Sequence, residues 1–193
     1  TNDKADWYVW ADPLPDGSPP TNWHSHFGGP AWEFDPGRGQ YYLHNFLASQ
    51  PDLYFHNPDV VDAILETCKF WLDRGLDGFR LDTVNYYFHD QKLRSNPPAQ
   101  KGPQVMATDL YGMQDNIYNK TRPENLGFLK RMRALCDQYD DIMMVGEVGE
   151  MGHRSIEIMG EYTAGTSMLH MAYSFAMLGP DFNAEHFTNC IQG

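Results

Sequence analysis

Apolar residues in the second two-thirds of the chain alternate between helical spacing and short, nearly continuous runs. Spacings of three and four predict helices over residues 59–74, 121–136, 155–160 and 183–191. The apolar runs between them are typical of strands that are buried on both faces, and they cover residues 77–82, 142–148 and 167–175. This alternation of helix and strand predicts an α/β fold with parallel strands and right-handed crossovers.

Polar residues and a glycine mark the ends of the first two predicted helices. Asp59 is the expected cap of the first helix and Gly75 its expected stop. Thr121 and Glu124 have the spacing of a capping box at the start of the second helix. From Thr83 almost to Thr121 the pattern predicts no regular element, and a loop of that length in a compact domain is typically functional.

Residues 1–58 show almost no helical periodicity and are rich in Trp, Tyr, Phe, Gly and Pro. Trp32–Phe34 and Gln40–His44 flank the turn sequence of residues 35–39, which predicts a β-hairpin. Most of the aromatic side chains are expected to form a small core, and a minority to stack on a ligand. We therefore predict an irregular, partly β segment over 1–58, followed by an α/β segment over 59–193.

Charge and composition narrow the classes of partner. The formal net charge of −12 argues against nucleic acid or anionic lipid as the main partner, because both require a basic surface. No apolar run approaches the roughly 20 residues that span a bilayer, and no signal peptide is evident. Cys68, Cys136 and Cys190 lie far apart and indicate free thiols in a reducing compartment, so we expect a cytoplasmic location.

The strand that ends at Asp82 places two charged residues on one face. Side chains alternate along a strand, so Arg80 and Asp82 share a face, whereas Phe79 and Leu81 point the other way. Charges are expensive inside a sheet that is covered on both sides. Asp82 is therefore either part of a functional site or half of a structural ion pair, and this strand alone does not decide between the two.

A second carboxylate, Glu147, ends the next predicted strand. Neighbouring strands lie about 4.8 Å apart, which places the two carboxyl groups near the ~5–5.5 Å separation of a retaining glycosidase. Arg80 would keep Asp82 ionised as a nucleophile, whereas Glu147, with no basic residue nearby in sequence, could stay protonated and act as the acid. Two such carboxylates could instead hold magnesium. Glu150 is a weaker alternative to Glu147, because it lies past the strand.

Five motifs, in this order and spacing, give the chain a specific resemblance. Gly78–Asn85 and Val145–Glu147 resemble the strand-four and strand-five motifs of the alpha-amylase superfamily of glycoside hydrolases. The inserted B domain of its α-glucosidase and oligo-1,6-glucosidase branch is similar to Phe27–Trp32, Gln40–Phe46 and Gln50–Leu53. The resemblance covers nearly the whole chain. It implies a partial (β/α)8 barrel, about strands four to six, with residues 1–58 as B domain.

The resemblance also implies roles for individual residues. Asp82 corresponds to the nucleophile, Glu147 to the general acid and base, and Arg80 to the cation beside the nucleophile. Residues expected to line the sugar pocket are Phe27, Phe46 and Gln50. In this branch the residue after the nucleophile is commonly threonine in enzymes that cut α-1,4 bonds and valine in those that cut α-1,6 bonds, so Thr83 favours maltose-like substrates.

The implied activity is that of a retaining, exo-acting α-glucosidase on short oligosaccharides. Alternatives on the same residues are oligo-1,6-glucosidase, sucrose isomerase and transglucosidase activity, and an alternative of another class is a catalytically inactive sugar-binding or transporter-accessory module. No cofactor or metal is implied within the chain, while a structural cation elsewhere in a longer protein and the oligomeric state stay open. The family's late His-Asp motif, which supplies a third carboxylate, is not in these residues. We therefore expect a fragment that has no useful turnover alone.

Overall fold

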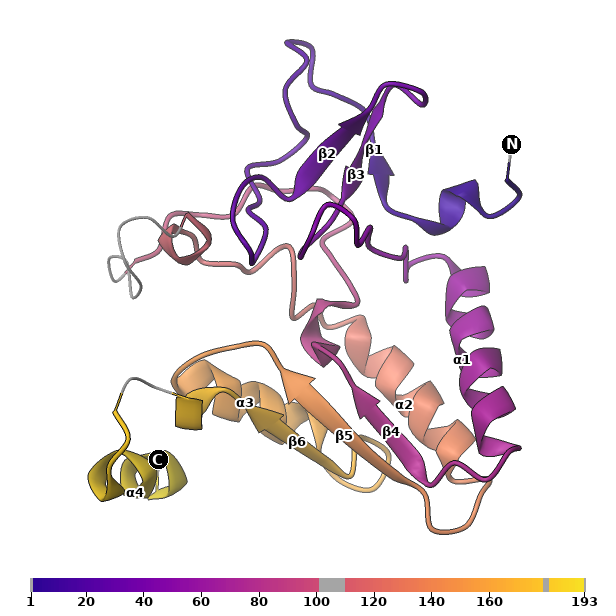
Figure 1. The fold of residues 1–193 in the computed structure, drawn as a ribbon, viewed down its shortest axis with the longest axis vertical. Coiled ribbons are helices and arrows are strands. Elements are labelled where there is room, and N and C mark those ends of the chain that lie inside the picture. Colours follow the sequence, from indigo (N-terminus) through magenta and orange to yellow (C-terminus); the bar gives the residue numbers. More distant parts are fainter. Residues whose placement is uncertain (1, 101–109, 179–180, 193) are drawn as a thin grey trace. The chain divides into compact units, whose positions relative to one another are not determined.

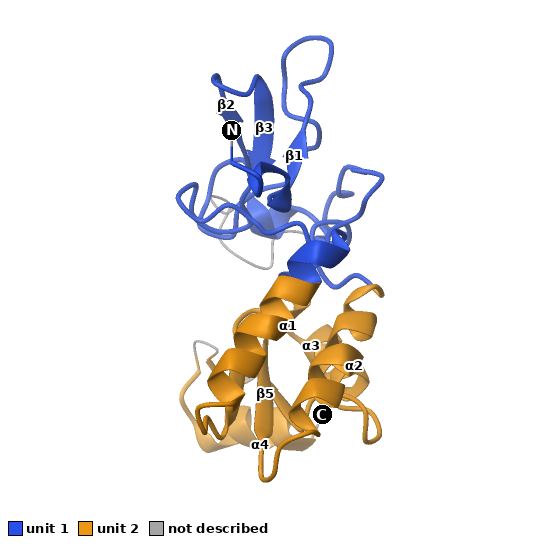
Figure 2. Cartoon of the chain, turned by 90° about the vertical axis from the view of Figure 1, so that its right-hand side faces the viewer, with its two compact units in different colours: residues 1–61, 86–122 blue, residues 62–85, 123–193 orange. Residues whose placement is uncertain are grey.

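The structure, a computed structural model, describes residues 2–100, 110–178 and 181–192. The chain forms two compact units, shown in blue and orange in Figure 2. Unit 1 comprises residues 1–61 and 86–122, and unit 2 comprises residues 62–85 and 123–193. The domain boundary that the sequence places after residue 58 stays a prediction.

A three-stranded parallel sheet forms the centre of unit 2 (Figure 1). Its strands are β4 (Gly78–Leu81), β5 (Met143–Val148) and β6 (Met171–Ser174), in the order β4-β5-β6. The described residues leave this sheet open at both edges, as expected for part of a barrel. The three predicted strands and their parallel direction are therefore confirmed, with narrower bounds.

Four helices follow the predicted pattern: α1 (Pro58–Leu72), α2 (Asn125–Cys136), α3 (His153–Tyr162) and α4 (Ala184–Gln192). Helices α1 and α2 run side by side along the sheet in Figures 1 and 2. An ion pair of 2.6 Å joins Arg131 on α2 to Asp62 on α1. Apolar α2 side chains, Phe128, Leu129 and Met132, are buried, and α3 packs against β5 and β6.

The predicted helix starts need two corrections. Helix α1 begins at Pro58, and the side chain of Asn57 accepts the Asp59 N–H at 2.9 Å, so the cap is Asn57 rather than Asp59. Helix α2 begins at Asn125, and Glu124 makes no side-chain cap. The capping box predicted from Thr121 is therefore wrong, because the helix starts four residues later.

The predicted stop of α1 at Gly75 is confirmed. Gly75 has a φ of +85°, the left-handed conformation that glycine adopts without steric cost. Its N–H bonds the Leu72 carbonyl at 2.9 Å, and the Leu76 N–H bonds the Trp71 carbonyl at 3.3 Å. These two bonds form a Schellman motif, which satisfies the last carbonyls of the helix.

Unit 1 contains a three-stranded antiparallel sheet and an aromatic core. The predicted hairpin is confirmed as β2 (Trp32–Asp35) and β3 (Gln40–Leu43), and β1 (Trp10–Ala11), which the sequence pattern did not predict, adds to β3. Buried residues form its core: Val9, Ala11, Trp23, Ala31, Trp32 and Leu43. The rings of Trp23 and Trp32 stack at 5.8 Å inside this core, and Tyr41 and Tyr54 pack against it. Tyr8, Phe27 and Phe34 are exposed, so the expected aromatic core includes fewer of these residues than predicted.

Short 3-10 turns account for the remaining described elements: η1 (Ala5–Trp7), η2 (Val84–Tyr86), η3 (Tyr111–Met113) and η4 (Ala176–Leu178). The long loop after Asp82 belongs to unit 1 from Tyr86 to Arg122, and its residues 101–109 lie outside the described part. Asn96 ties it to the first segment of unit 1, because its N–H bonds the Asn22 side chain at 2.8 Å. No helix in the described ranges is both long and apolar enough to cross a membrane.

The contact between β4 and β5 predicts the effect of a substitution at Gly78. A Cβ at this position would lie 1.9 Å from the carbonyl oxygen of Met143, and the φ of +152° is rarely adopted by other residues. Gly78→Ala should therefore lower the free energy of unfolding by on the order of 4 kcal/mol or more. Urea denaturation of the purified protein measures this change.

Gly127 in α2 is the matched control, because nothing lies within 4 Å of a Cβ built there. Gly127→Ala should leave stability unchanged or raise it by up to about 1 kcal/mol, since alanine favours helix. Equal effects of the two substitutions would contradict the close approach at Gly78.

Candidate active site

The structure brings Arg80, Asp82 and Glu147 together at the carboxyl ends of β4 and β5. Arg80 Nη2 lies 2.9 Å from Asp82 Oδ1 and also contacts Glu147 Oε2. The side chain of Asp82 is 71% exposed, whereas that of Glu147 is only 9% exposed. One carboxylate is thus accessible to a ligand, and the other is enclosed by protein.

The shared guanidinium limits the distance between the two carboxylates. Asp82 Oδ1 and Glu147 Oε2 touch the same nitrogen, so they lie at most roughly 6 Å apart, the sum of two charged contacts of about 3 Å each. Retaining glycosidases separate their carboxyl groups by about 5–5.5 Å, and inverting enzymes by about 6.5–9.5 Å. The observed geometry fits the retaining arrangement.

A third strand adds Tyr173, which the sequence analysis did not single out. Arg80 Nε donates to the Tyr173 hydroxyl at 2.9 Å, and that hydroxyl donates to Glu147 Oε2 at 2.7 Å. The hydrogen bonds to Tyr173 and Glu147 raise the pKa of Arg80 further above its already high value. The guanidinium therefore stays charged at any working pH.

The contact between Arg80 and Glu147 corrects one expectation. The sequence indicated no basic residue near Glu147, because none is close along the chain. In the sheet, Arg80 pairs with Val145, so Glu147 lies two residues further on the same face, within reach of the arginine side chain. The cation serves both carboxylates and not Asp82 alone.

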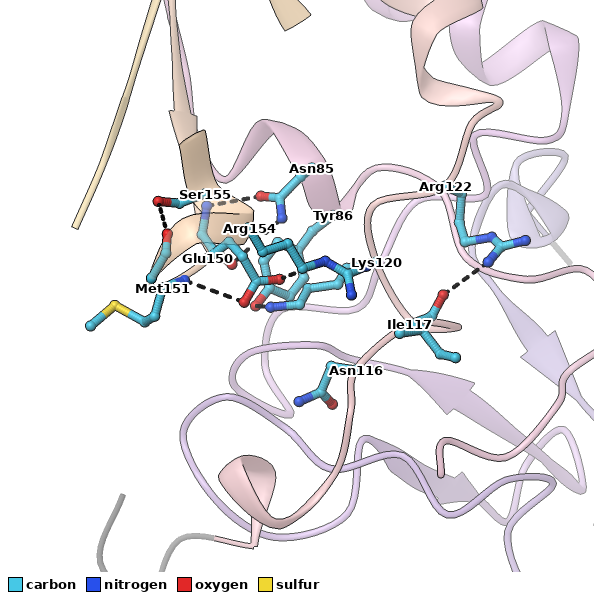
Figure 3. Close-up of polar contacts among 12 residues, drawn as sticks. Asn85, Tyr86, Asn116, Ile117, Lys120, Arg122, Glu150, Met151, Arg154 and Ser155 are labelled. Atoms are coloured by element: carbon cyan, nitrogen blue, oxygen red, sulfur yellow. Dashed lines mark hydrogen bonds and ion pairs between the residues drawn. The ribbon is translucent and has the colours of Figure 1, made fainter. Parts of the chain in front are cut away.

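Glu150, the weaker alternative to Glu147, has different surroundings. It lies beyond the end of β5, and its N–H bonds the Val148 carbonyl at 2.9 Å. Its carboxylate lies 3.8 Å from Arg154 in the first turn of α3, and Figure 3 shows the two side chains together. Within unit 2 the contacts of Glu150 thus point toward the start of α3.

The backbone after Asp82 is held in place by two asparagines. Asn85 Oδ1 accepts the Gly149 N–H at 2.9 Å, which connects the segments that follow β4 and β5 (Figure 3). Asn125 Nδ2 donates to the Val84 carbonyl at 2.8 Å and to the Tyr162 hydroxyl at 3.0 Å. These bonds fix the loop that positions Asp82.

Thr83 lies just past the end of β4 and outside the strand. Its φ is +38°, a conformation that is unusual for a β-branched residue. Such backbone strain persists only where the surrounding structure holds it, and it is concentrated at functional sites. The hydrogen bonds of Val84 and Asn85 supply that support next to Thr83.

The position just before Glu147 has room only for a glycine, Gly146. A Cβ at this position would lie 2.5 Å from Leu169 Cδ1 and 3.1 Å from Val84 Cγ1. The segment after β4 therefore packs directly on the β5 backbone beside the acidic pair.

The predicted sugar-pocket residues of unit 1 form an aromatic group and a turn. The rings of Phe27 and Phe46 lie 5.7 Å apart, and His26 contacts both. Phe27 is 63% exposed, so its ring is accessible. The Gln50 side chain accepts the Leu47 N–H at 3.3 Å. The role of Phe27, Phe46 and Gln50 in binding sugar stays a prediction.

Two of the motifs in unit 1 are joined by Asp52. Its carboxylate accepts the Asn45 side chain at 2.5 Å and the Asn45 N–H at 3.2 Å. Asn119 then donates to Asn45 Oδ1 at 3.1 Å. Desolvation raises the pKa of Asp52 to about 7, against the opposing effect of the Asn45 hydrogen bonds. The contacts of Asp52 give it a structural role.

The donor set does not fit the magnesium hypothesis. The guanidinium of Arg80 occupies the position between the carboxylates that a divalent cation would take, and its charge would repel such an ion. Across the described ranges, no group of three or more His, Cys, Asp or Glu side chains could hold a metal ion. The observed arrangement fits acid–base and nucleophilic chemistry better.

Comparison with known proteins places this geometry in a family. Residues 1–192 match the model of the alpha amylase catalytic domain. A protein named "Probable alpha-glucosidase" from Rhizobium meliloti is 57% identical over 94% of this chain, and an "Oligo-1,6-glucosidase" from Heyndrickxia coagulans is 37% identical over 93%. The chain covers 33% and 30% of these two proteins, so it spans about a third of the length of the curated relatives it matches.

A solved structure is also similar to this chain. The crystal structure of the alpha-glucosyl transfer enzyme XgtA matches all of this chain with a TM-score of 0.90 and 50% identity, over 36% of its own length. The predicted fold class, a partial (β/α)8 barrel, is confirmed by these matches together with the open parallel sheet.

The raised pKa of Asp52 predicts how stability depends on pH. The folded protein holds this proton up to about pH 7, whereas the unfolded chain loses it near 3.8, so the contribution of Asp52 to stability is complete below pH ~4 and is lost as pH rises to ~7. In this window the free energy of unfolding should fall by up to about 1.4 kcal/mol per pH unit more in the wild type than in Asp52→Asn.

Chemical denaturation at several pH values measures the difference, with the exposed Asp3→Asn as matched control. Parallel pH dependences of the wild type and Asp52→Asn would contradict the assignment.

Proposed function

This chain belongs to the alpha-amylase family of glycoside hydrolases, and we propose that it supplies the catalytic acids of a retaining α-glucosidase. The proposal rests on one observation: Asp82 and Glu147 end adjacent parallel strands, and Arg80 contacts both. The third carboxylate and the remaining barrel strands would come from other parts of a longer protein.

The reaction proceeds in two displacements. Asp82 attacks the anomeric carbon of the terminal glucose while Glu147 gives its proton to the departing glycosidic oxygen, which leaves a β-glucosyl ester on Asp82. Water then attacks the same carbon, Glu147 takes a proton from that water, and the ester bond to Asp82 breaks. Because each step inverts the anomeric carbon, the product keeps the α configuration.

Arg80 and the different exposure of the acids support these roles. The Arg80 guanidinium lies 2.9 Å from Asp82 Oδ1 and can orient this carboxylate for attack. The exposed Asp82 side chain can reach a bound sugar, whereas the enclosed Glu147 is better protected from bulk solvent. Both chemical roles are filled by protein carboxylates, so we propose that the reaction requires no cofactor. We also propose that the enzyme acts in the cytoplasm.

Short α-1,4-linked glucosides such as maltose are the proposed substrates. Thr83, directly after Asp82, supports this choice over α-1,6 linkages through the resemblance described above. Phe27, which is exposed and packs against Phe46, offers an accessible aromatic face for a sugar ring. The relative named oligo-1,6-glucosidase keeps the α-1,6 alternative open to test.

Glucosyl transfer to another sugar is the second candidate function. It is favoured by the match to XgtA, whose structure is titled that of an alpha-glucosyl transfer enzyme. The two activities share the glucosyl ester and differ in whether water or a sugar hydroxyl reaches it first. Product analysis at high maltose concentration separates them, since transfer yields trisaccharides. The retained Asp82 and Glu147 do not support a catalytically inactive binding module.

Covalent trapping tests the role of Asp82. A fluorinated α-glucosyl fluoride slows breakdown of the ester, so the full-length protein should gain one fluoroglucosyl group, located on the Asp82 peptide by mass spectrometry. Asp82→Asn should remove the label and lower kcat by at least about 10³-fold. Glu150→Gln is the control and should still be labelled. Label on another residue would contradict the proposal.

A single substitution tests the linkage preference. Thr83→Val keeps the branched Cβ, and so the backbone strain, while it replaces the hydroxyl by a methyl group. We expect the ratio of kcat/KM for maltose to that for isomaltose to fall about tenfold, as selection at one such group allows. An unchanged ratio would show that Thr83 does not select the linkage.

A further inference from the structure

We propose that Tyr173 is a positioning residue that fixes which oxygen of Glu147 transfers the proton. The inference rests on the proposed function and concerns a residue on a third strand, β6. In the sheet, Tyr173 is the direct partner of Glu147, so the two side chains lie on the same face. Tyr173 therefore connects the cation and the acid from a neighbouring strand.

The direction of the hydrogen bonds follows from the chemistry of the groups. A guanidinium only donates, so the Tyr173 hydroxyl oxygen accepts the bond from Arg80 Nε at 2.9 Å. The hydroxyl has a single proton, which is then available for Glu147 Oε2 at 2.7 Å. Tyr173 is thus held by Arg80 with its own proton directed at the carboxylate.

The two oxygens of Glu147 consequently differ. Oε2 accepts from both Arg80 Nη2 and Tyr173, so a proton placed on Oε2 would oppose two donors. All hydrogen bonds and ion pairs that the described residues make to the Glu147 carboxylate involve Oε2 and none involves Oε1. The catalytic proton therefore resides on Oε1, and from there it passes to the glycosidic oxygen as the bond to the anomeric carbon breaks.

The burial of Glu147 strengthens the effect of its hydrogen bonds on the position of the proton. Glu147 is almost completely buried, and hydrogen bonds to a buried carboxylate are stronger than those in water. Without the Tyr173 hydroxyl, Oε2 would lose one of its donors and Arg80 Nε would lose its acceptor. Oε2 would then compete with Oε1 for the proton, and less of the acid would be ready for transfer.

The test is Tyr173→Phe in the full-length enzyme, assayed on two substrates whose leaving groups differ. A sugar leaving group needs a proton from the acid, whereas fluoride departs without one. We expect kcat/KM for maltose to fall about 10–100-fold and that for α-glucosyl fluoride to fall less than about threefold. The alkaline limb of the maltose pH profile should move to higher pH, because a carboxylate that has lost a donor keeps its proton longer.

Two further variants serve as controls for Tyr173→Phe. Tyr139→Phe removes a tyrosine hydroxyl that bonds Asp73 away from these groups, and both activities should be unchanged. Glu147→Gln should lose maltose hydrolysis and retain cleavage of α-glucosyl fluoride. If Glu147→Gln still hydrolyses maltose at the wild-type rate, the proposed function fails, and this inference fails with it.

Equal losses of Tyr173→Phe on both substrates, or no loss on maltose, would overturn the role of Tyr173 while leaving the proposed function intact. If Tyr173→Phe does not fold, 3-fluorotyrosine at position 173 replaces it. This near-isosteric residue is a stronger hydrogen-bond donor, so the alkaline limb should move to lower pH, opposite to the shift in Tyr173→Phe. An unmoved limb would overturn the inference.

Discussion

One guanidinium holds the candidate site together. Two carboxylates at the tips of neighbouring strands repel each other, and Arg80 offsets this repulsion by contacting both. The parallel register of β4 and β5 makes these contacts geometrically accessible, and the tight contacts of Gly78 and Gly146 keep the strands and the following loop in close approach. Sheet packing and site chemistry therefore depend on the same few residues.

Much of this organisation could be predicted from the sequence. Apolar spacings of three and four located the helices, and short continuous apolar runs located the parallel strands, because burial of one or of both faces produces these patterns. The alternation of side chains along a strand predicted that Arg80 and Asp82 share a face, and their ion pair confirms it. Helix starts were less predictable, since Asn57 and Asp59 are both good caps and the backbone selects one of them.

Cross-strand contacts could not be derived from the linear sequence. The contact of Arg80 with Glu147 depends on which residues stand opposite each other in the sheet, and the role of Tyr173 depends on a third strand. A signal for Tyr173 does exist: a hydroxyl-bearing side chain near the carboxyl end of a third parallel strand. Asp52 lies in one of the sequence motifs, but its raised pKa follows from desolvation, which depends on the folded surroundings and not on the order of residues.

The stereochemistry of the first product tests the central claim most directly. Carboxylates bridged by one guanidinium leave too little room for a water molecule between Asp82 and the anomeric carbon, so the account requires two displacements at that carbon. Proton NMR of maltose hydrolysis by the full-length enzyme, recorded within the first minutes, should show α-glucose appearing from the non-reducing end before mutarotation. Initial release of β-glucose would contradict the account.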